Sequence, residues 1–273
     1  MAVIKERLEY LLTREHDKVT TSPECKSQLV EFLTKEGRSS RFELEFLIRL
    51  SSAGDRVITK EAESCDKLES ADEDLLMKLC QLNNEGHQKA VMLWKLSKEG
   101  DYKGGILGAQ AQFLVNNANI SRVMFKHYND VVFAEGWYED RKQAAALISE
   151  VNPRHASRCY EFAAEAAYRI FEKTGDENWF NAWKESCDLA IKLREKINIR
   201  SACFLARDMA TIFFNRYQKY ANVEHLNSAV KYYMQALKMS KECYDLPNAT
   251  IDSMKSTLYI AGEILGTKFL KKI

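Results

Sequence analysis

The chain has 273 residues, of which 46% are hydrophobic and 29% are charged, as in ordinary globular proteins. Three prolines and eleven glycines are too few for an all-β fold with many tight turns, and the length fits one elongated domain or two smaller ones. The net charge of +1 gives no overall field that would favour nucleic acid or anionic lipid, which argues against a dedicated nucleic-acid-binding protein.

The first hundred residues predict ordinary amphipathic helices. We expect these helices over about residues 2–16, 22–37 and 40–54. Ser40 is followed three residues later by Glu43, which is the spacing of a capping box at the start of a helix. A more polar stretch then precedes two further helices. One of them follows a second capping box at Ser70 and Glu73, and the other covers about residues 88–98.

We expect a domain boundary after residue 100. The sequence Glu-Gly-Asp at 99–101 ends the preceding helix, and the glycine pair at 104–105 predicts a loop or tight turn. Residues 1–100 are therefore predicted to form a helical N-terminal bundle. Residues 101–273 are predicted to form a helical-repeat region that closes with a capping helix.

Longer helices joined by short turns are predicted from residue 106 onward. The short turns at 174–176 and 220–222 are typical of connections between antiparallel neighbours. The predicted helices cover approximately residues 106–118, 120–134, 137–150, 154–173, 177–196, 199–220, 223–243 and 247–270.

A repeat of 46 residues organises this region. Trp137, Trp183 and Ala229 are separated by this interval, and two further sets of small or apolar residues keep the same step. These sets are Ala144, Ala190 and Ala236, and Leu147, Leu193 and Met239. A fixed period of this size is typical of stacked helix pairs, which usually serve as binding surfaces.

Two of the repeated helices carry a polar face opposite an apolar one. In stacked repeats the first helix of each pair lines the concave face, so its polar side chains are placed to meet a ligand. The alternative is a solvated face, on which Glu165 and Arg169 pair four residues apart. The repeat also puts Asn119 in the column of Glu165 and Thr211. The candidate partner-binding residues are therefore Asn119, Arg158, Glu165, Arg169, Asp208, Thr211 and Asn215.

The helix–turn–helix pattern resembles the tetratricopeptide-repeat-like superfamily over about residues 106–273. The residues that carry this resemblance are Tyr168, Gly175, Trp183 and Ala190 in one unit, and Phe214, Ala221, Ala229 and Ala236 in the next. The period is longer than the 34 residues of a standard repeat. The resemblance implies an all-α fold of antiparallel helix-hairpin repeats stacked as a solenoid.

A second resemblance, over about residues 158–216, is to the 14-3-3 proteins. It rests on the segment 205–215, Leu-Ala-Arg-Asp-Met-Ala-Thr-Ile-Phe-Phe-Asn, and on the run 167–170, Ala-Tyr-Arg-Ile. The arginine of that family's phosphate site would be Arg169, whereas its tyrosine is replaced by Ile170 and its asparagine by Asp208. Because an acid beside the pocket repels phosphate, the resemblance implies a helical groove without implying phosphopeptide binding.

Neither the amino-terminal segment nor the cysteines suggest a special location or a bound group. Charged residues interrupt residues 1–12, so we expect an amphipathic helix there and no signal peptide. No apolar run approaches the roughly 20 residues that would cross a membrane. The seven cysteines are scattered without a CxxC pair, which is typical of reduced thiols. We therefore expect a cytoplasmic protein with no cofactor and no metal.

The function that these patterns favour is a non-enzymatic adaptor that binds a peptide or partner helix in a concave helical groove. Tyr168 and Phe204 are the expected aromatic anchors. The alternative is a nucleic-acid-binding or regulatory helical-repeat protein. The basic residues Lys192, Lys196 and Arg200 are, however, expected to be solubilising. An enzyme is the third alternative, and a homodimer formed through the last helix stays open.

Overall fold

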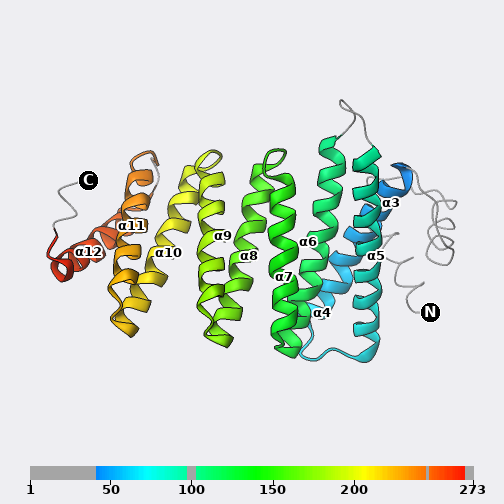
Figure 1. The fold of residues 1–273 in the computed structure, drawn as a ribbon, viewed down its shortest axis with the longest axis horizontal. Helices are drawn as coiled ribbons and strands as arrows, with labels where there is room; N and C mark the ends of the chain where they lie inside the picture. The colour runs from blue at the N-terminus through cyan, green and yellow to red at the C-terminus, as the bar shows by residue number, and fades with distance from the viewer. Residues whose placement is uncertain (1–40, 97–102, 244–245, 268–273) are drawn as a thin grey trace. The chain divides into compact units, whose positions relative to one another are not determined.

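The computed structural model describes residues 41–96, 103–243 and 246–267. Helices and short turns account for these residues, and no strand occurs among them (Figure 1). The predicted all-α class, built from consecutive antiparallel helix pairs, is confirmed. The helices expected over 2–16 and 22–37 lie outside the described residues. The chain divides into two compact units, which we call unit 1 (residues 1–151 and 172–175) and unit 2 (residues 152–171 and 176–273).

The described part of unit 1 combines a π-helix with α-helices of very different length. A π-helical turn inside helical structure often accompanies a functional or strained site. The elements are α3 (Arg41–Gly54), η1 (Asp55–Thr59, the π-helix), α4 (Lys60–Ser64), α5 (Ser70–Leu96), α6 (Lys103–Tyr128) and α7 (Val131–Ile148). The helix expected over 40–54 is therefore confirmed as α3.

Helix α5 is continuous where the sequence predicts two helices. Gly86, near its middle, does not break the helix and instead allows close packing, because a Cβ atom there would lie 2.4 Å from Cζ of Phe113 in α6. Leu76 and Leu79 on the same helix are buried with Ile120 of α6. Contacts between helices therefore override the low helix propensity of glycine.

Helix α6 also replaces two predicted helices, over 106–118 and 120–134. Asn116 and Asn117, near the predicted break, are buried and hydrogen-bonded to other helices. Their amides are thereby prevented from competing with the helix backbone. The turn lies further along, where Asn129 has φ 52° and the side chain of Asp130 accepts a hydrogen bond from the backbone N–H of Val132 at 3.1 Å. Helix α7 accordingly begins earlier than the expected residue 137.

The domain boundary expected after residue 100 falls in a segment outside the described residues, so it stays a prediction. The described helices that flank this segment, α5 and α6, belong to the same compact unit and pack against each other. The glycine pair at 104–105, expected in a loop, lies in the first turn of α6.

Unit 2 matches the predicted elements closely. Its helices are α8 (Pro153–Thr174), α9 (Glu177–Glu195), α10 (Ile199–Tyr220), α11 (Val223–Ser240) and α12 (Asn248–Leu265), and α10 and α11 lie side by side (Figure 1). Polar caps explain the agreement. The side chains of Asp176, Asn198 and Asn222 accept backbone hydrogen bonds at the starts of α9, α10 and α11. Gly175 supplies the positive φ of 70° that the preceding turn requires.

The 46-residue period is visible in the helix boundaries. Helices α7, α9 and α11 begin at residues 131, 177 and 223, and α8 and α10 begin at 153 and 199. Of the residues that carried the period in the sequence, Leu147 and Leu193 are half-buried and the rest are buried. Trp137, Trp183 and Ala229 are all buried, and so are the alanines Ala144, Ala190 and Ala236. The residues that repeat at this interval therefore lie on the side of α7, α9 and α11 that packs against other helices.

Candidate interaction surface

The predicted binding residues of α8 are all exposed. Arg158, Glu165 and Arg169 lie on the solvent side of this helix, opposite the buried alanines Ala163 and Ala167. The face assignment made from the sequence therefore agrees with the structure. Exposure makes these side chains available to a partner, but it does not by itself identify the kind of partner.

The predicted binding residues of α10 are exposed as well, and two of them already have partners. Asp208 accepts hydrogen bonds from Nε and Nη2 of Arg207, at 2.9 and 2.6 Å. The hydroxyl of Thr211 donates to the backbone carbonyl of Arg207 at 3.0 Å and lies 3.0 Å from the hydroxyl of Tyr233. Asn215 is exposed one turn further along. A ligand at this face would meet an Arg207 side chain that Asp208 holds in place.

Asn119, the remaining predicted residue, takes part in the internal packing of unit 1. Its amide nitrogen donates to both carboxylate oxygens of Asp55, at 3.1 and 2.9 Å, and its carbonyl oxygen accepts a hydrogen bond from Nη2 of Arg141. Asn119 is half-buried and Arg141 is buried. Because both ends of the amide are engaged internally, Asn119 is not open to a partner in the way that the exposed residues of α8 and α10 are.

Arginine side chains lie over two half-exposed phenylalanines of unit 2. On α8, the guanidinium carbon of Arg158 is 5.7 Å from the ring centre of Phe162. On α10, those of Arg200 and Arg207 are 5.8 and 4.9 Å from the ring centre of Phe204. Each such cation–π contact contributes about 0.5–1 kcal/mol at an exposed site. Arginine and aromatic side chains are also the types most enriched where proteins bind one another.

Arg194, near the end of α9, connects these two groups of residues. Its guanidinium forms an ion pair with Glu161 of α8 and donates a hydrogen bond to the hydroxyl of Ser201 of α10. Glu161 precedes Phe162, and Ser201 follows Arg200. Arg194 therefore joins α8 and α10 at residues that are adjacent in sequence to the two phenylalanine–arginine groups. Sequence reasoning singled out Phe204 as an anchor but missed Phe162, Arg194 and Arg207.

A buried aromatic cluster lies elsewhere in unit 2 and contains a buried cation. Arg216 of α10 is buried, with its guanidinium carbon 3.8 Å from the ring centre of Phe180 and 4.6 Å from that of Phe171. It donates to Glu177 at 2.6 Å and, through Nε, to Nε2 of His225 at 3.3 Å. Tyr168, the other expected anchor, is half-buried against Trp183 with ring centres 5.6 Å apart. This cluster holds helices α8 to α11 together.

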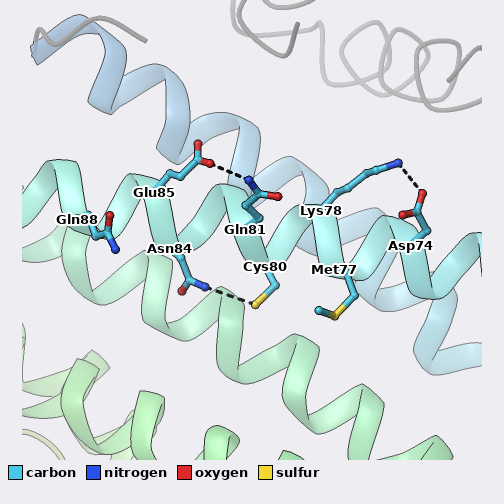
Figure 2. Close-up of a pocket in the computed structure, with 8 residues that line it drawn as sticks. All are labelled: Asp74, Met77, Lys78, Cys80, Gln81, Asn84, Glu85 and Gln88. Carbon is cyan, nitrogen blue, oxygen red and sulfur yellow. Dashed lines mark hydrogen bonds and ion pairs between the residues drawn. The ribbon is translucent and has the colours of Figure 1, made fainter. Parts of the chain in front are cut away.

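A shallow hollow of about 450 Å³ lies along α5 of unit 1 (Figure 2). Its lining residues come from this one helix and are Asp74, Met77, Lys78, Cys80, Gln81, Asn84, Glu85 and Gln88. Several of them are paired along the helix, as Figure 2 shows for Gln81 with Glu85 at 3.1 Å and for Asn84 with Cys80 at 3.8 Å. None of the predicted binding residues lines this hollow.

The environment of three cysteines weakens them as nucleophiles. Burial, followed by the charge of Asp140, raises the pKa of the Cys80 thiol. Burial raises the pKa of Cys203 to about 11 and also raises that of Cys187. Because the thiolate is the reactive form, these thiols are poorly suited to covalent catalysis at neutral pH. Within the described part of the chain, no three His, Cys, Asp or Glu side chains are grouped so that they could hold a metal ion.

No α-helix in the described ranges is both long enough and apolar enough to cross a lipid bilayer.

Comparisons with known proteins give similarities of fold and assign no family. No family model matches the chain, and no curated protein matches it. Among solved structures, it is similar to a chain of the "DHF58 filament", with a TM-score of 0.46 and 14% identity over 79% of this chain and 96% of that one. It is also similar to the de novo designed helical repeat protein DHR64, with a TM-score of 0.43 and 16% identity over 78% and 96%.

A third similar structure comes from the computational design of self-assembling cyclic homo-oligomers. It has a TM-score of 0.43 and 14% identity over 81% of this chain and 92% of that one. The chain thus resembles designed helical-repeat proteins. Our assignment of the fold class rests on the packing of its own helices, since identity this low carries no information on function.

Proposed function

We propose that this protein is a non-enzymatic interaction module that binds a peptide or partner helix on the exposed face of α8 and α10. The observation that carries the proposal is the surface on which Arg158 lies over Phe162 while Arg200 and Arg207 lie over Phe204. Aromatic rings stiffened by arginines provide contact area at little cost in side-chain entropy. The tetratricopeptide-like relationship and a cytoplasmic location are parts of the same proposal.

The predicted polar residues extend this surface along both helices. Glu165 and Arg169 continue it on α8, and Thr211 and Asn215 continue it on α10. Residues of both charge signs and neutral hydrogen-bonding groups are therefore exposed on the two helices. Such a mixture suits recognition of an extended peptide or of the polar edge of a helix.

A library of random peptides displayed on phage and selected on the full chain tests this proposal. Selected peptides are then titrated against the double variant Arg169→Glu/Asp208→Lys, which reverses one exposed charge on each helix. We expect a loss of affinity of about tenfold or more, because complementary charges become repulsive.

The matched control is Lys238→Glu/Asp252→Lys, which reverses two exposed charges on α11 and α12. Circular dichroism confirms that both variants are folded. Equal binding of the selected peptides to wild type and to the Arg169/Asp208 variant would show that they do not bind the α8–α10 face. The nucleic-acid alternative predicts instead that an oligonucleotide binds at low salt and dissociates steeply as salt is added.

A further inference from the structure

Helix α12, the last described helix of unit 2, exposes large apolar side chains to solvent. It packs against α11, beside which it lies in Figure 1, and its residues Met254 and Leu258 are buried. Tyr259 and Ile260, by contrast, are 61% and 50% exposed, and Ile264 is 47% exposed one turn further along. The last helix of a repeat stack needs a polar outer face to keep the protein in solution, so these apolar side chains call for a partner.

Two opposite charges lie at equal distances on either side of Tyr259. Lys255 comes four residues before it and Glu263 four residues after it, and both side chains are exposed. Because an α-helix rises 1.5 Å and turns by about 100° per residue, each charge lies about 6 Å along the axis from Tyr259. The two charges point about 40° to opposite sides of the tyrosine. We call this set the α12 face: Lys255, Tyr259, Ile260, Glu263 and Ile264.

This arrangement of charges is complementary to itself. When two copies of a helix lie antiparallel about a two-fold axis, each residue before the axis lies level with the residue equally far beyond it in the other copy. With Tyr259 at the axis, Lys255 of each copy lies level with Glu263 of the other, which gives two equivalent ion pairs. A parallel arrangement would instead place each charge beside its own kind.

We propose that the α12 face binds the same face of a second copy of this chain, as an antiparallel helix pair centred on Tyr259. The two tyrosine rings meet at the axis, and Ile260 and Ile264 lie beside them at the edge of the contact. Each α12 thereby gains an antiparallel neighbour on the side opposite its buried residues. The proposal uses no residue of the α8–α10 face, so it is independent of the proposed function.

The size of the contact implies a weak dimer. One helix face from each copy offers less than the roughly 800 Å² per partner of a standard interface. Apolar burial supplies the attraction, and the two ion pairs determine the direction and register of the helices. We therefore expect dissociation constants of about 10–100 μM, so that monomers and dimers exchange in solution.

Sedimentation velocity of the full chain over about 5–300 μM tests the proposal. We expect the sedimentation coefficient to rise from that of a monomer toward that of a dimer. Lys255→Glu places two acids opposite each other at both ends of the pair, and Glu263→Lys places two bases there. Each single variant should weaken association about tenfold or more. Circular dichroism checks that the variants are folded.

Exchanging the two charges supplies the decisive comparison. The double variant Lys255→Glu/Glu263→Lys is again complementary to itself and should associate within about threefold of wild type. An equimolar mixture of the two single variants should associate more tightly than either alone, because one copy brings only acids and the other only bases. Lys238→Glu, at an exposed position of α11, changes net charge as Lys255→Glu does and should alter association by less than about twofold.

Several results would overturn the proposal. A chain that stays monomeric over the whole range would leave the α12 face to a different partner. A dimer that is unaffected by the single variants would lie on another face, and one that the double variant fails to restore would have another register. Equal weakening by Lys238→Glu and Lys255→Glu would show that only net charge is sensed. None of these results bears on peptides that depend on Arg169 and Asp208, which test the proposed function separately.

Discussion

The interiors of the two units differ in chemistry although both are built from paired helices. In unit 1, amides and hydroxyls cross between helices. The hydroxyl of Ser51 joins the buried side chains of Asn83 and Asn116, and Asn117 donates to Asn84 at 2.7 Å. Unit 2 has instead a continuous aromatic cluster, in which the ring centre of Phe180 lies 4.8 to 5.3 Å from those of three other rings.

This difference shows that the repeat determines the positions of the helices and not the chemistry of the interior. Buried amides and hydroxyls that bond across helices favour one register of α3, α5 and α6, because a shift would leave them without these partners. An aromatic cluster gains stability from buried area and tolerates small shifts.

The largest effect is expected from Phe180→Ala in the aromatic cluster. Removing this ring leaves a cavity beside Trp183 and Phe213 and uncovers one side of Arg216, which should cost unit 2 about 3–5 kcal/mol. Hydrogen exchange followed by mass spectrometry on the full chain should show the loss of protection in α8 to α11. Phe180→Leu keeps most of the volume and is the control. Equal loss of protection in α5 and α6 would show that the two interiors are not separate.

The corresponding change in unit 1 is Ser51→Ala. It removes the hydroxyl that joins Asn83 and Asn116 and should destabilise unit 1 by about 1–3 kcal/mol, because both amides lose a buried partner. Urea denaturation measures the change in the free energy of unfolding. Ser253→Ala, at an exposed position of α12, should stay within about 0.5 kcal/mol. An equally small effect of Ser51→Ala would mean that the polar network contributes nothing to stability.

Asp140 on α7 should make the stability of unit 1 fall as the pH rises. Burial, opposed by Arg141 and reinforced by Glu139, raises the pKa of its carboxyl from 3.8 to about 7. Between these values the native state holds a proton that the unfolded state has released, so unfolding becomes easier as the pH increases. After allowance for partial exposure, we expect about 1–2 kcal/mol between pH 4 and 7. Asp140→Asn should flatten this slope in urea titrations, and an unchanged slope would contradict the assignment.

His225 should give unit 2 a smaller dependence of the opposite sign. Burial and then the charge of Arg216 lower the pKa of the imidazole, while Glu177 and Glu224 oppose the shift. As the pH falls below 6.5, the unfolded state gains a proton that the native state resists, so unit 2 loses stability. His225→Gln should remove this loss, as measured by hydrogen exchange in α10 and α11 at pH 7.5 and 5.5. If the His225→Gln variant still loses stability at pH 5.5, a group other than His225 causes the loss.

Helices could be predicted from the sequence wherever local signals decide the structure. The short turn at 174–176 and the column Trp137–Trp183–Ala229 correctly predicted the start of α9 and the repeat, and the structure shows that Asp176 and Asn198 cap α9 and α10. The prediction was wrong for α6, because an asparagine pair favours a break unless other helices supply hydrogen bonds. No single-helix signal reports the partners Ser51 and Asn84, which belong to α3 and α5.

The candidate surface was predictable only in part for a similar reason. Helical spacing identified the exposed positions Arg158 and Asp208, and Phe204 was expected as an aromatic anchor. The role of Arg194 depends on side chains of two other helices, which spacing within α9 cannot reveal.

Photo-crosslinking of a display-selected peptide tests the central claim most directly. A benzophenone analogue of phenylalanine is placed at position 162 or 204, and at the exposed positions of Met77 on α5 and Tyr259 on α12 as controls. If the exposed face of α8 and α10 binds the peptide, adducts form at 162 and 204, disappear with excess unlabelled peptide and are weak at both controls. Adducts of equal yield at Met77 or Tyr259, or none at 162 and 204, would contradict the account.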